Sequence, residues 1–519
     1  MWALLRSLAY TLAALILPLV ALATYRLTLH PLARVPGPRA AAVSNAWLAW
    51  QVRGGRLLAL GKRLHKTYGP VVRVGVDEVW VCSKEGFAAV YVGLGGGGFE
   101  KGGFYLATAL NKPEMDWTGG LHFPDTLDLL SEFDVKRYRL QRRLMGPVYQ
   151  AANLKKFERA VDEVMERAVA RLRELDGAEV DLKEWMHIIT VECLGAVVLS
   201  WSPGYIRNAS DGGTSAQGYL GWRRKTIFGL FPLVTTASFF SKTVARQFSN
   251  LWGVTFKTPR NFKPFFTPVY QKSSGRITAA LRKINPTTDP RKDLLADLIN
   301  LHKSRPDEFT EPYLRRLAVT NFGAGHETMT SALTAAMAMI ASHAAAARAV
   351  AAESRNTAPG GSRCEYTAAS IREAQRLHPV IGMALPRRTP RGGVCLHGHF
   401  LPAGTTIGCN PVSLHRDEEI FGGDADVFVP ERWFRDEGQG RGVIERYNLT
   451  WGGGGRTCPG RNLAEMVLGR VVQGLWREFD VRVVEMPPEE EVRYYFMAML
   501  TDVRVRFVPV DEGVEGGGR

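Results

Sequence analysis

The sequence predicts a mainly α-helical body with small β-sheets, an α+β fold, preceded by one N-terminal transmembrane helix. The 519-residue chain is 45% hydrophobic and 23% charged, which is a globular composition and excludes a disordered or fibrous protein. Amphipathic stretches of good helix formers are long, whereas alternating apolar and polar residues occur only in short runs. The first acidic residue is Asp77, so the N-terminal end differs in character from the rest of the chain.

The N-terminal segment has the pattern of a membrane anchor. Ser7 to Tyr25 is a charge-free run of 19 residues, and about 20 apolar residues are needed to cross a bilayer. Nine basic residues follow between Arg26 and Arg73, which places the C-terminal side in the cytoplasm by the positive-inside rule. We therefore expect residues 1–25 to be an anchor. A cleaved secretory signal is the alternative, but the long run and its basic flank favour the anchor.

Ten charges of the net +15 come from the same N-terminal region. Residues 1–76 contain ten of the 66 basic residues and none of the 51 acidic ones, so the other 443 residues carry 56 basic and 51 acidic side chains. A basic excess next to an apolar run fits contact with an anionic lipid bilayer. No nucleic-acid partner is expected.

The remaining segments follow in order along the chain. Prolines make residues 26–45 a semi-rigid spacer, residues 46–510 form one body, and residues 511–519 are predicted to be a disordered tail. Residues 312–350 predict one unusually long, Ala-rich helix, with a Gly-Ala-Gly interruption at 323–325. The other expected elements are a β-hairpin over 69–83, helices over 152–176, 293–303 and 365–378, and short strands within 394–410 and 479–508.

Of six cysteines, only Cys458 has a setting that suggests chemistry. The other five lack CxxC pairs and zinc-site spacing, so we expect them to be ordinary, buried or half-buried and unpaired: Cys82, Cys193, Cys364, Cys395 and Cys409.

Four glycines precede Cys458, and Pro459 suits the first turn of a helix whose apolar pattern begins at Leu463. The helix dipole, backbone amides and Arg456 would favour a thiolate, and we expect the sulfur to be buried. A thiolate held in this way is what a sulfur ligand of iron needs.

At these residues the chain resembles the cytochrome P-450 superfamily of heme-thiolate monooxygenases, in particular its fungal microsomal members. The family signature FxxGxRxCxG is matched at Trp451, Gly454, Arg456, Cys458 and Gly460, with Trp451 where the family has Phe. The resemblance implies a cytochrome P-450 fold and a heme b cofactor whose iron takes Cys458 as its axial thiolate.

Two further motifs resemble those of the family. Ala324-Gly325-His326-Glu327-Thr328 is similar to its oxygen-binding stretch, in which small residues leave room for dioxygen. Thr328 would relay protons and Glu327 would supply the acid behind it. The resemblance also implies a buried structural network of three residues, Glu373 and Arg376 of an ExxR motif and Arg432 of a PERW segment.

Heme propionates need cations, and the resemblance implies three of them. Arg142 belongs to a stretch similar to the family motif WxxxR, with Tyr138 in place of Trp or His. Arg387 and Arg456 are the other two.

The implied activity is insertion of one oxygen atom from O2 into a hydrophobic small molecule, as in hydroxylation or epoxidation of a secondary metabolite or xenobiotic. Electrons would come from NADPH through the FAD and FMN of NADPH-cytochrome P-450 reductase, with cytochrome b5 as a further partner. The implied location is the endoplasmic reticulum membrane, with a single-pass anchor and a cytoplasmic catalytic domain. The substrate pocket would involve the 102–130 loop, the 200–250 segment, Phe322, residues 381–385 and residues 497–500, and the reductase would dock on Arg137, Arg139, Lys155, Lys156 and Arg461.

Two alternatives stay open. One is a heme-thiolate isomerase or dehydratase, which the intact Glu327-Thr328 pair disfavours. The other is a non-enzymatic membrane protein that has lost heme. Only 44 residues separate Thr328 from Glu373, and residues 343–365 are expected to lack a well-formed second helix before the ExxR helix.

Overall fold

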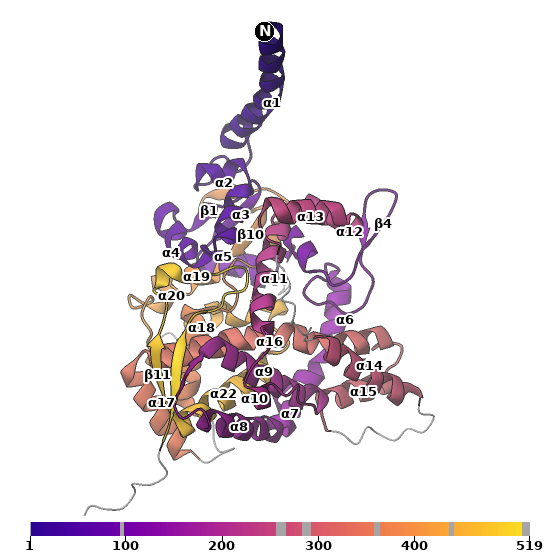
Figure 1. The fold of residues 1–519 in the computed structure, drawn as a ribbon. Helices are drawn as coiled ribbons and strands as arrows, with labels where there is room; N and C mark the ends of the chain where they lie inside the picture. The colour runs from indigo at the N-terminus through magenta and orange to yellow at the C-terminus, as the bar shows by residue number, and fades with distance from the viewer. Residues whose placement is uncertain are drawn as a thin grey trace, which may run out of the picture.

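The computed structural model of the chain describes residues 2–93, 98–255, 266–282, 292–357, 364–434 and 441–510. Figure 1 shows a helix-rich body from which α1 projects as a separate rod. The prediction of a mainly helical fold with small sheets is confirmed. The helices are α1 (Trp2–Thr28), α2 (Arg39–Val43), α3 (Ala46–Arg53), α4 (Leu57–Tyr68), α5 (Lys84–Phe87), α6 (Val135–Met145), α7 (Ala151–Leu154), α8 (Glu158–Arg173), α9 (Leu182–Leu199), α10 (Tyr205–Asn208), α11 (Thr214–Gly229), α12 (Pro232–Phe240), α13 (Lys242–Leu251), α14 (Phe266–Arg282), α15 (Leu294–Ser304), α16 (Glu311–Ala341), α17 (Ala344–Asn356), α18 (Glu365–Leu377), α19 (Pro411–Leu414), α20 (Glu418–Phe421), α21 (Arg441–Tyr447) and α22 (Arg461–Glu478).

The strands form small sheets. The largest has the order β1-β2-β10-β7-β3, in which β10 runs parallel to β2 and the other neighbours are antiparallel. Its last pair places Lys101 opposite Arg387, which matters for the site described below. The predicted hairpin over 69–83 is confirmed by the antiparallel pairing of β1 and β2. The strands are β1 (Val71–Arg73), β2 (Glu78–Val81), β3 (Glu100–Lys101), β4 (Glu114–Met115), β5 (Leu121–His122), β6 (Glu179–Asp181), β7 (Arg387–Arg388), β8 (Val394–Leu396), β9 (His399–Leu401), β10 (Thr406–Cys409), β11 (Phe479–Glu485) and β12 (Arg504–Pro509).

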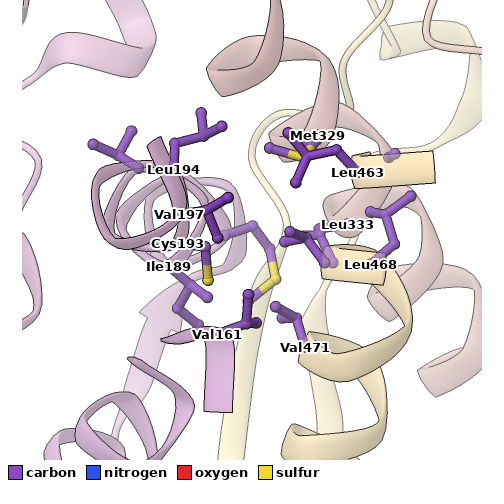
Figure 2. Packing of buried hydrophobic residues seen from close by; sticks show 14 of the residues in the cluster. Val161, Ile189, Cys193, Leu194, Val197, Met329, Leu333, Leu463, Leu468 and Val471 are labelled. Atoms are coloured by element: carbon purple, nitrogen blue, oxygen red, sulfur yellow. The ribbon is translucent and has the colours of Figure 1, made fainter. Parts of the chain in front are cut away.

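Helix α16 lies at the centre of the largest hydrophobic core. It packs most extensively against α9 and also contacts α18, α14 and α22. Figure 2 shows side chains of α8, α9, α16 and α22 meeting there, with Leu194 and Cys193 on α9, Met329 and Leu333 on α16, and Leu463 on α22. The second half of α16 is apolar nearly all round, as expected of a helix covered on every side.

The single helix predicted over 312–350 is wrong. The segment forms two helices, α16 and α17, which meet at an angle of 109°. At the break, the backbone of His343 is extended, and its ring Nδ1 lies 2.7 Å from the carbonyl oxygen of Met339. The predicted interruption at 323–325 is wrong as well, because α16 continues through it.

The expectation that residues 343–365 lack a well-formed second helix is also wrong. Helix α17 runs for 13 residues and packs against α22, α18 and α16. Its carboxylate Glu353 accepts hydrogen bonds from the backbone N–H groups of Tyr366 and Thr367 at 2.9 and 2.8 Å, so it caps the start of α18. The short interval is therefore compatible with a properly supported ExxR helix.

The N-terminal region is helical from Trp2 to Thr28. Within the described residues, no single helix is both long and apolar enough to cross a membrane, and the apolar part of α1 that qualifies as a shorter helix is Ile16–Thr28. Helices α16 and α17 would qualify together by length and composition, but α16 is largely buried in the core. Arg73 is only 2% exposed and donates to the carbonyl of Arg26 at 2.9 Å, so it does not face lipid. The predicted tail at 511–519 lies outside the described residues.

All six cysteines are free. Four of the five that we expected to be ordinary are buried, but Cys395 is exposed, against expectation. It lies in the middle of β8, in the two-stranded β8–β9 sheet, with half-buried Val394 and buried Leu396 as its neighbours. Alternate side chains of a strand point to opposite faces, so Cys395 faces away from the buried side.

Candidate active site

The glycine-rich loop before α22 folds back on Cys458. The Cys458 N–H donates to the carbonyl of Trp451 at 2.7 Å and closes the loop. Gly454 has a φ of +60°, and a Cβ at this position would lie 1.9 Å from the carbonyl oxygen of Tyr91. Only glycine fits there. Helix α22 begins at Arg461, so the prediction that Pro459 lies in its first turn is wrong.

The sulfur of Cys458 lies at the N-terminal end of α22. The surrounding protein raises the pKa of the thiol by desolvation, while the backbone N–H groups of Gly460 and Arg461 and the guanidinium charge of Arg142 lower it. The expectation of a buried sulfur agrees with this desolvation, which outweighs the opposing effects and keeps the pKa of the thiol above its ordinary value, although part of the Cys458 residue is exposed. The preceding loop contributes four glycines and hence no side chains that could cover it. A thiol that faces backbone N–H groups and the charge of Arg142 is well placed to bind a metal ion as thiolate.

Next to this loop, cations surround the ring of Tyr138. Lys101 Nζ lies 5.1 Å and Arg456 Cζ 5.4 Å from the ring centroid. Arg387 is 4% exposed and lies over the rings of Tyr91 and Tyr105, with its Nη1 donating to the Tyr105 hydroxyl at 3.0 Å. The predicted Tyr138, Arg387 and Arg456 are thus brought together in one cluster.

Lys101 belongs to this cluster and was missed by sequence reasoning. It is 6% exposed and donates to the backbone carbonyls of Leu129 and Glu132. Burial, together with the charges of Arg456 and Arg387, lowers its pKa to about 7. No motif or spacing marks Lys101, since only the pairing of β3 with β7 brings it to Arg387.

The cluster has unused capacity for anions. Nη1 of Arg142 and Nη1 of Arg456 are buried and have no hydrogen-bond partner among the described residues. Within the described residues, no carboxylate forms an ion pair with any of the four cations Lys101, Arg142, Arg387 and Arg456. Buried donors of this kind are costly unless a ligand satisfies them. The cluster therefore suits a ligand with carboxylate groups.

One face of α16 is open although the helix is central. Ala324 is exposed and Thr328, one turn later, is half-buried. The Thr328 hydroxyl donates to the carbonyl of Ala324 at 2.6 Å. A Cβ on Gly325 would lie 3.2 Å from the side chain of Leu194, so glycine here lets α16 approach α9 closely. Small residues thus leave room for a ligand along this face.

Glu327 points away from that face. Its side chain is buried, and its Oε2 accepts a hydrogen bond from Nε1 of Trp222 on α11 at 2.5 Å. Burial raises the pKa of Glu327 to about 7, against the opposing effects of the Trp222 hydrogen bond and of Lys225 and Lys183. Among the described contacts, none joins the Glu327 carboxylate to the Thr328 hydroxyl. Trp222 was not predicted as a site residue.

The three residues of the predicted structural network lie together and are fully buried. Glu373 accepts from Arg376 at 2.7 and 2.9 Å and from Arg432 at 2.8 Å. It also accepts from the indole of Trp433 at 3.0 Å. Arg376 in turn donates to the carbonyls of His415 and Ala425. Each charge is paired and hydrogen-bonded, as burial requires.

A family model described as Cytochrome P450 matches residues 36–502, which is most of the chain. The chain belongs to the cytochrome P450 family. It is 61% identical to the cytochrome P450 monooxygenase sdnT of Sordaria araneosa, over 94% of this chain and 93% of that protein. It is 26% identical to the cytochrome P450 monooxygenase gsfF of Penicillium aethiopicum, over 93% and 94% of the two chains. This cytochrome P450 is therefore a monooxygenase.

The family's heme-thiolate cofactor fits the residues present. Cys458 would ligate the iron, and the propionates would meet the unpartnered nitrogens of Arg142 and Arg456 together with Lys101 and Arg387. Heme bound in this way supplies the activation of dioxygen.

A large cleft of about 1000 Å³ lies beside the cation cluster rather than at Cys458. It extends between the 100–137 segment, the 229–236 segment and the edge of the main sheet. Lys101 and Phe104 line it, so the cleft borders the cation cluster at Lys101. Two of the segments predicted to form the substrate pocket, 102–130 and 200–250, contribute to its walls.

Proposed function

We propose that this cytochrome P450 hydroxylates or epoxidises a hydrophobic small molecule of secondary metabolism. In the balanced reaction, RH, O2, NADPH and H+ give ROH, H2O and NADP+. The observation that carries the proposal is the combination of the Cys458 thiol at the N-terminal end of α22 with a cluster of buried cations that lack carboxylate partners. The walls of the cleft combine charged and polar residues with apolar ones, and the apolar side chains of Phe104, Phe123 and Leu230 support a hydrophobic substrate.

Two side chains of α16 would handle the protons of this reaction. Thr328 is half-buried on the open side of the helix, where its hydroxyl, which donates to the Ala324 carbonyl, would be the proton donor nearest to the heme. The pKa of Glu327, raised to about 7 by burial, suits a group that both takes up and releases protons near neutral pH. In this proposal, Glu327 is the local proton store and Thr328 is the donor nearest to oxygen.

The electrons would come from NADPH through a flavoprotein reductase, with cytochrome b5 as a second donor. Arg139 and Lys155 support this proposal because they are exposed on or near elements that flank the Cys458 loop, whereas Arg461 is exposed but paired with Glu465 at 3.0 Å. Arg137 does not support it, since its guanidinium is half-buried and paired with Glu132 at 2.9 Å. Lys156 is exposed but paired with Asp297 at 2.8 Å.

The proposed location is the endoplasmic reticulum membrane, with α1 as the anchor and the catalytic body in the cytoplasm. The described side chains of α1 include exposed Leu17, Leu19 and Val20, whose contact with lipid would remove them from water. Leu233 on α12 is 88% exposed, and Figure 1 shows α12 and α13 at the same end of the body as α1. These apolar side chains support a body that rests on the bilayer.

The reduced, CO-bound absorption spectrum tests the proposal. We expect a Soret band at the heme-thiolate position for the wild type and its loss in Cys458→Ala. Cys395→Ala is the matched control, because it also removes an exposed thiol and should leave the band unchanged. Turnover that consumes neither O2 nor NADPH would instead identify an isomerase or dehydratase.

A further inference from the structure

The catalytic carboxylate proposed above is held by a residue that belongs to another helix and to no family motif. Trp222 of α11 donates from its indole Nε1 to Oε2 of Glu327, and the two residues are 105 positions apart in the sequence. Glu327 is 5% exposed, so few other groups can satisfy its oxygens. The indole is therefore the principal neutral donor that the described residues offer to this carboxylate.

The orientation of this donor is set by aromatic packing. The Trp222 ring stacks on Phe496, with centroids 5.4 Å apart and an interplanar angle of 21°. Lys225 Nζ lies 4.8 Å from the Trp222 ring centroid. Phe496 in turn packs against Phe104 at 5.2 Å, and Phe104 lines the large cleft. A continuous aromatic stack thus connects the wall of the cleft to the Glu327 carboxylate (Phe104, Phe496, Trp222).

Other titratable groups near Glu327 come from three helices. On α16, Nε2 of His326 lies 3.9 Å from Oε1 of Glu327, and burial lowers the pKa of His326 to about 3, so that this ring is neutral. On α9, the ring of His187 faces that of His326, and the charge of Lys183 lowers the pKa of Glu327. On α11, Lys225 acts in the same direction. Trp222 exerts the largest of the effects that favour the charged form of Glu327.

We propose that Trp222 is a positioning residue for proton delivery, which holds the Glu327 carboxylate toward α11 and links it mechanically to Phe104 in the wall of the large cleft. This inference rests on the proposed role of Glu327 as the proton store. Trp222 does not touch dioxygen in this proposal. It determines where the carboxylate points and how readily the carboxylate gains and loses its proton.

Trp222→Phe tests the inference because it keeps a ring to stack on Phe496 and removes only the N–H donor. The first measurement is the infrared C=O band of the protonated Glu327 carboxyl, followed against pH in the full chain and identified by its absence in Glu327→Gln. Loss of a hydrogen bond to a charged group should raise the midpoint of this titration by about one to two pH units. The second measurement is the share of NADPH that yields H2O2 instead of product, which should increase.

Trp252→Phe is the matched control, since Trp252 packs on Phe231 and Phe248 and lies outside the site. It should shift neither measurement. An unchanged midpoint in Trp222→Phe, in a variant with a normal CO-bound spectrum, would overturn the inference. If Glu327→Gln makes product with the wild-type share of NADPH lost to H2O2, the proposed role of Glu327 as the proton store fails. The infrared midpoint alone then tests whether Trp222 holds the Glu327 carboxylate.

Discussion

Arg432 donates from its Nε to Oε1 of Glu373 at 2.8 Å, although the two residues are 59 positions apart. Both side chains are fully buried, and Arg376 donates to both oxygens of the same carboxylate. The contact fastens α18 to the segment before the Cys458 loop. Removal of one partner would leave buried charge without compensation, so the stability of this part of the fold depends on the complete network.

Glu373→Ala should therefore lower the free energy of unfolding by about 3 to 5 kcal/mol, because it removes the carboxylate that the buried guanidinium groups of Arg376 and Arg432 share and leaves Arg432 with Asp424 alone among its paired carboxylates in the described residues. Chemical denaturation monitored by circular dichroism measures this loss. Glu431→Ala is the matched control, since Glu431 is exposed and accepts only from Tyr366. Its effect should stay within about 0.5 kcal/mol. Equal effects of the two substitutions would contradict a central role of the network.

Lys101→Met should weaken the retention of heme. Lys101 contributes a buried cation to the cluster around Tyr138, and loss of a charge-assisted hydrogen bond to a propionate corresponds to about a tenfold faster transfer of heme to a scavenger protein. Lys112→Met controls for the loss of a lysine, because Lys112 is exposed and lies over the ring of Phe240. Heme loss that is unaltered in Lys101→Met would exclude Lys101 from the propionate site.

The network around Glu373 and the cation cluster around Tyr138 show which parts of the molecule the sequence can predict. Glu373 and Arg376 stand three positions apart on one helix turn, and Cys458 lies in a glycine-rich loop, so their local motifs could be matched to those of the family. Lys101 and Trp222 act through contacts with residues far away in the chain, and no local pattern distinguishes them from other lysines and tryptophans. The break between α16 and α17 was missed for a similar reason, because the Ala-rich segment contains neither Gly nor Pro at Ser342-His343.

The buried Glu327 makes a pH-dependent contribution to stability. Its pKa rises from 4.5 to about 7 on folding, so the folded state binds the proton more tightly. This contribution is fully present below pH 4.5 and is lost as the pH rises through about 7. Relative to the wild type, Glu327→Gln should gain about 3 kcal/mol of unfolding free energy between these limits.

Denaturation midpoints measured from pH 4.5 to 8 in the wild type and in Glu327→Gln check this prediction. The difference between the two proteins isolates Glu327 from other buried groups such as Glu78, whose pKa burial also raises to about 7. A difference that is constant across the pH range would show that the Glu327 carboxyl is not perturbed.

The Cys458 loop should tolerate no side chain at Gly454. A Cβ there would overlap the carbonyl of Tyr91, and the φ of +60° is strained for any other residue. Gly454→Ala should therefore cost about 2 to 5 kcal/mol and reduce the heme content of the purified protein. Gly469→Ala is the opposite case, since Gly469 lies within α22 with open space around it and should gain about 0.5 to 1 kcal/mol. The ratio of heme absorbance to protein absorbance, read together with the unfolding curve, separates loss of the loop from general instability. If Gly454→Ala bound heme as fully as Gly469→Ala, the close approach of this loop to Tyr91 would not be needed to present the thiol.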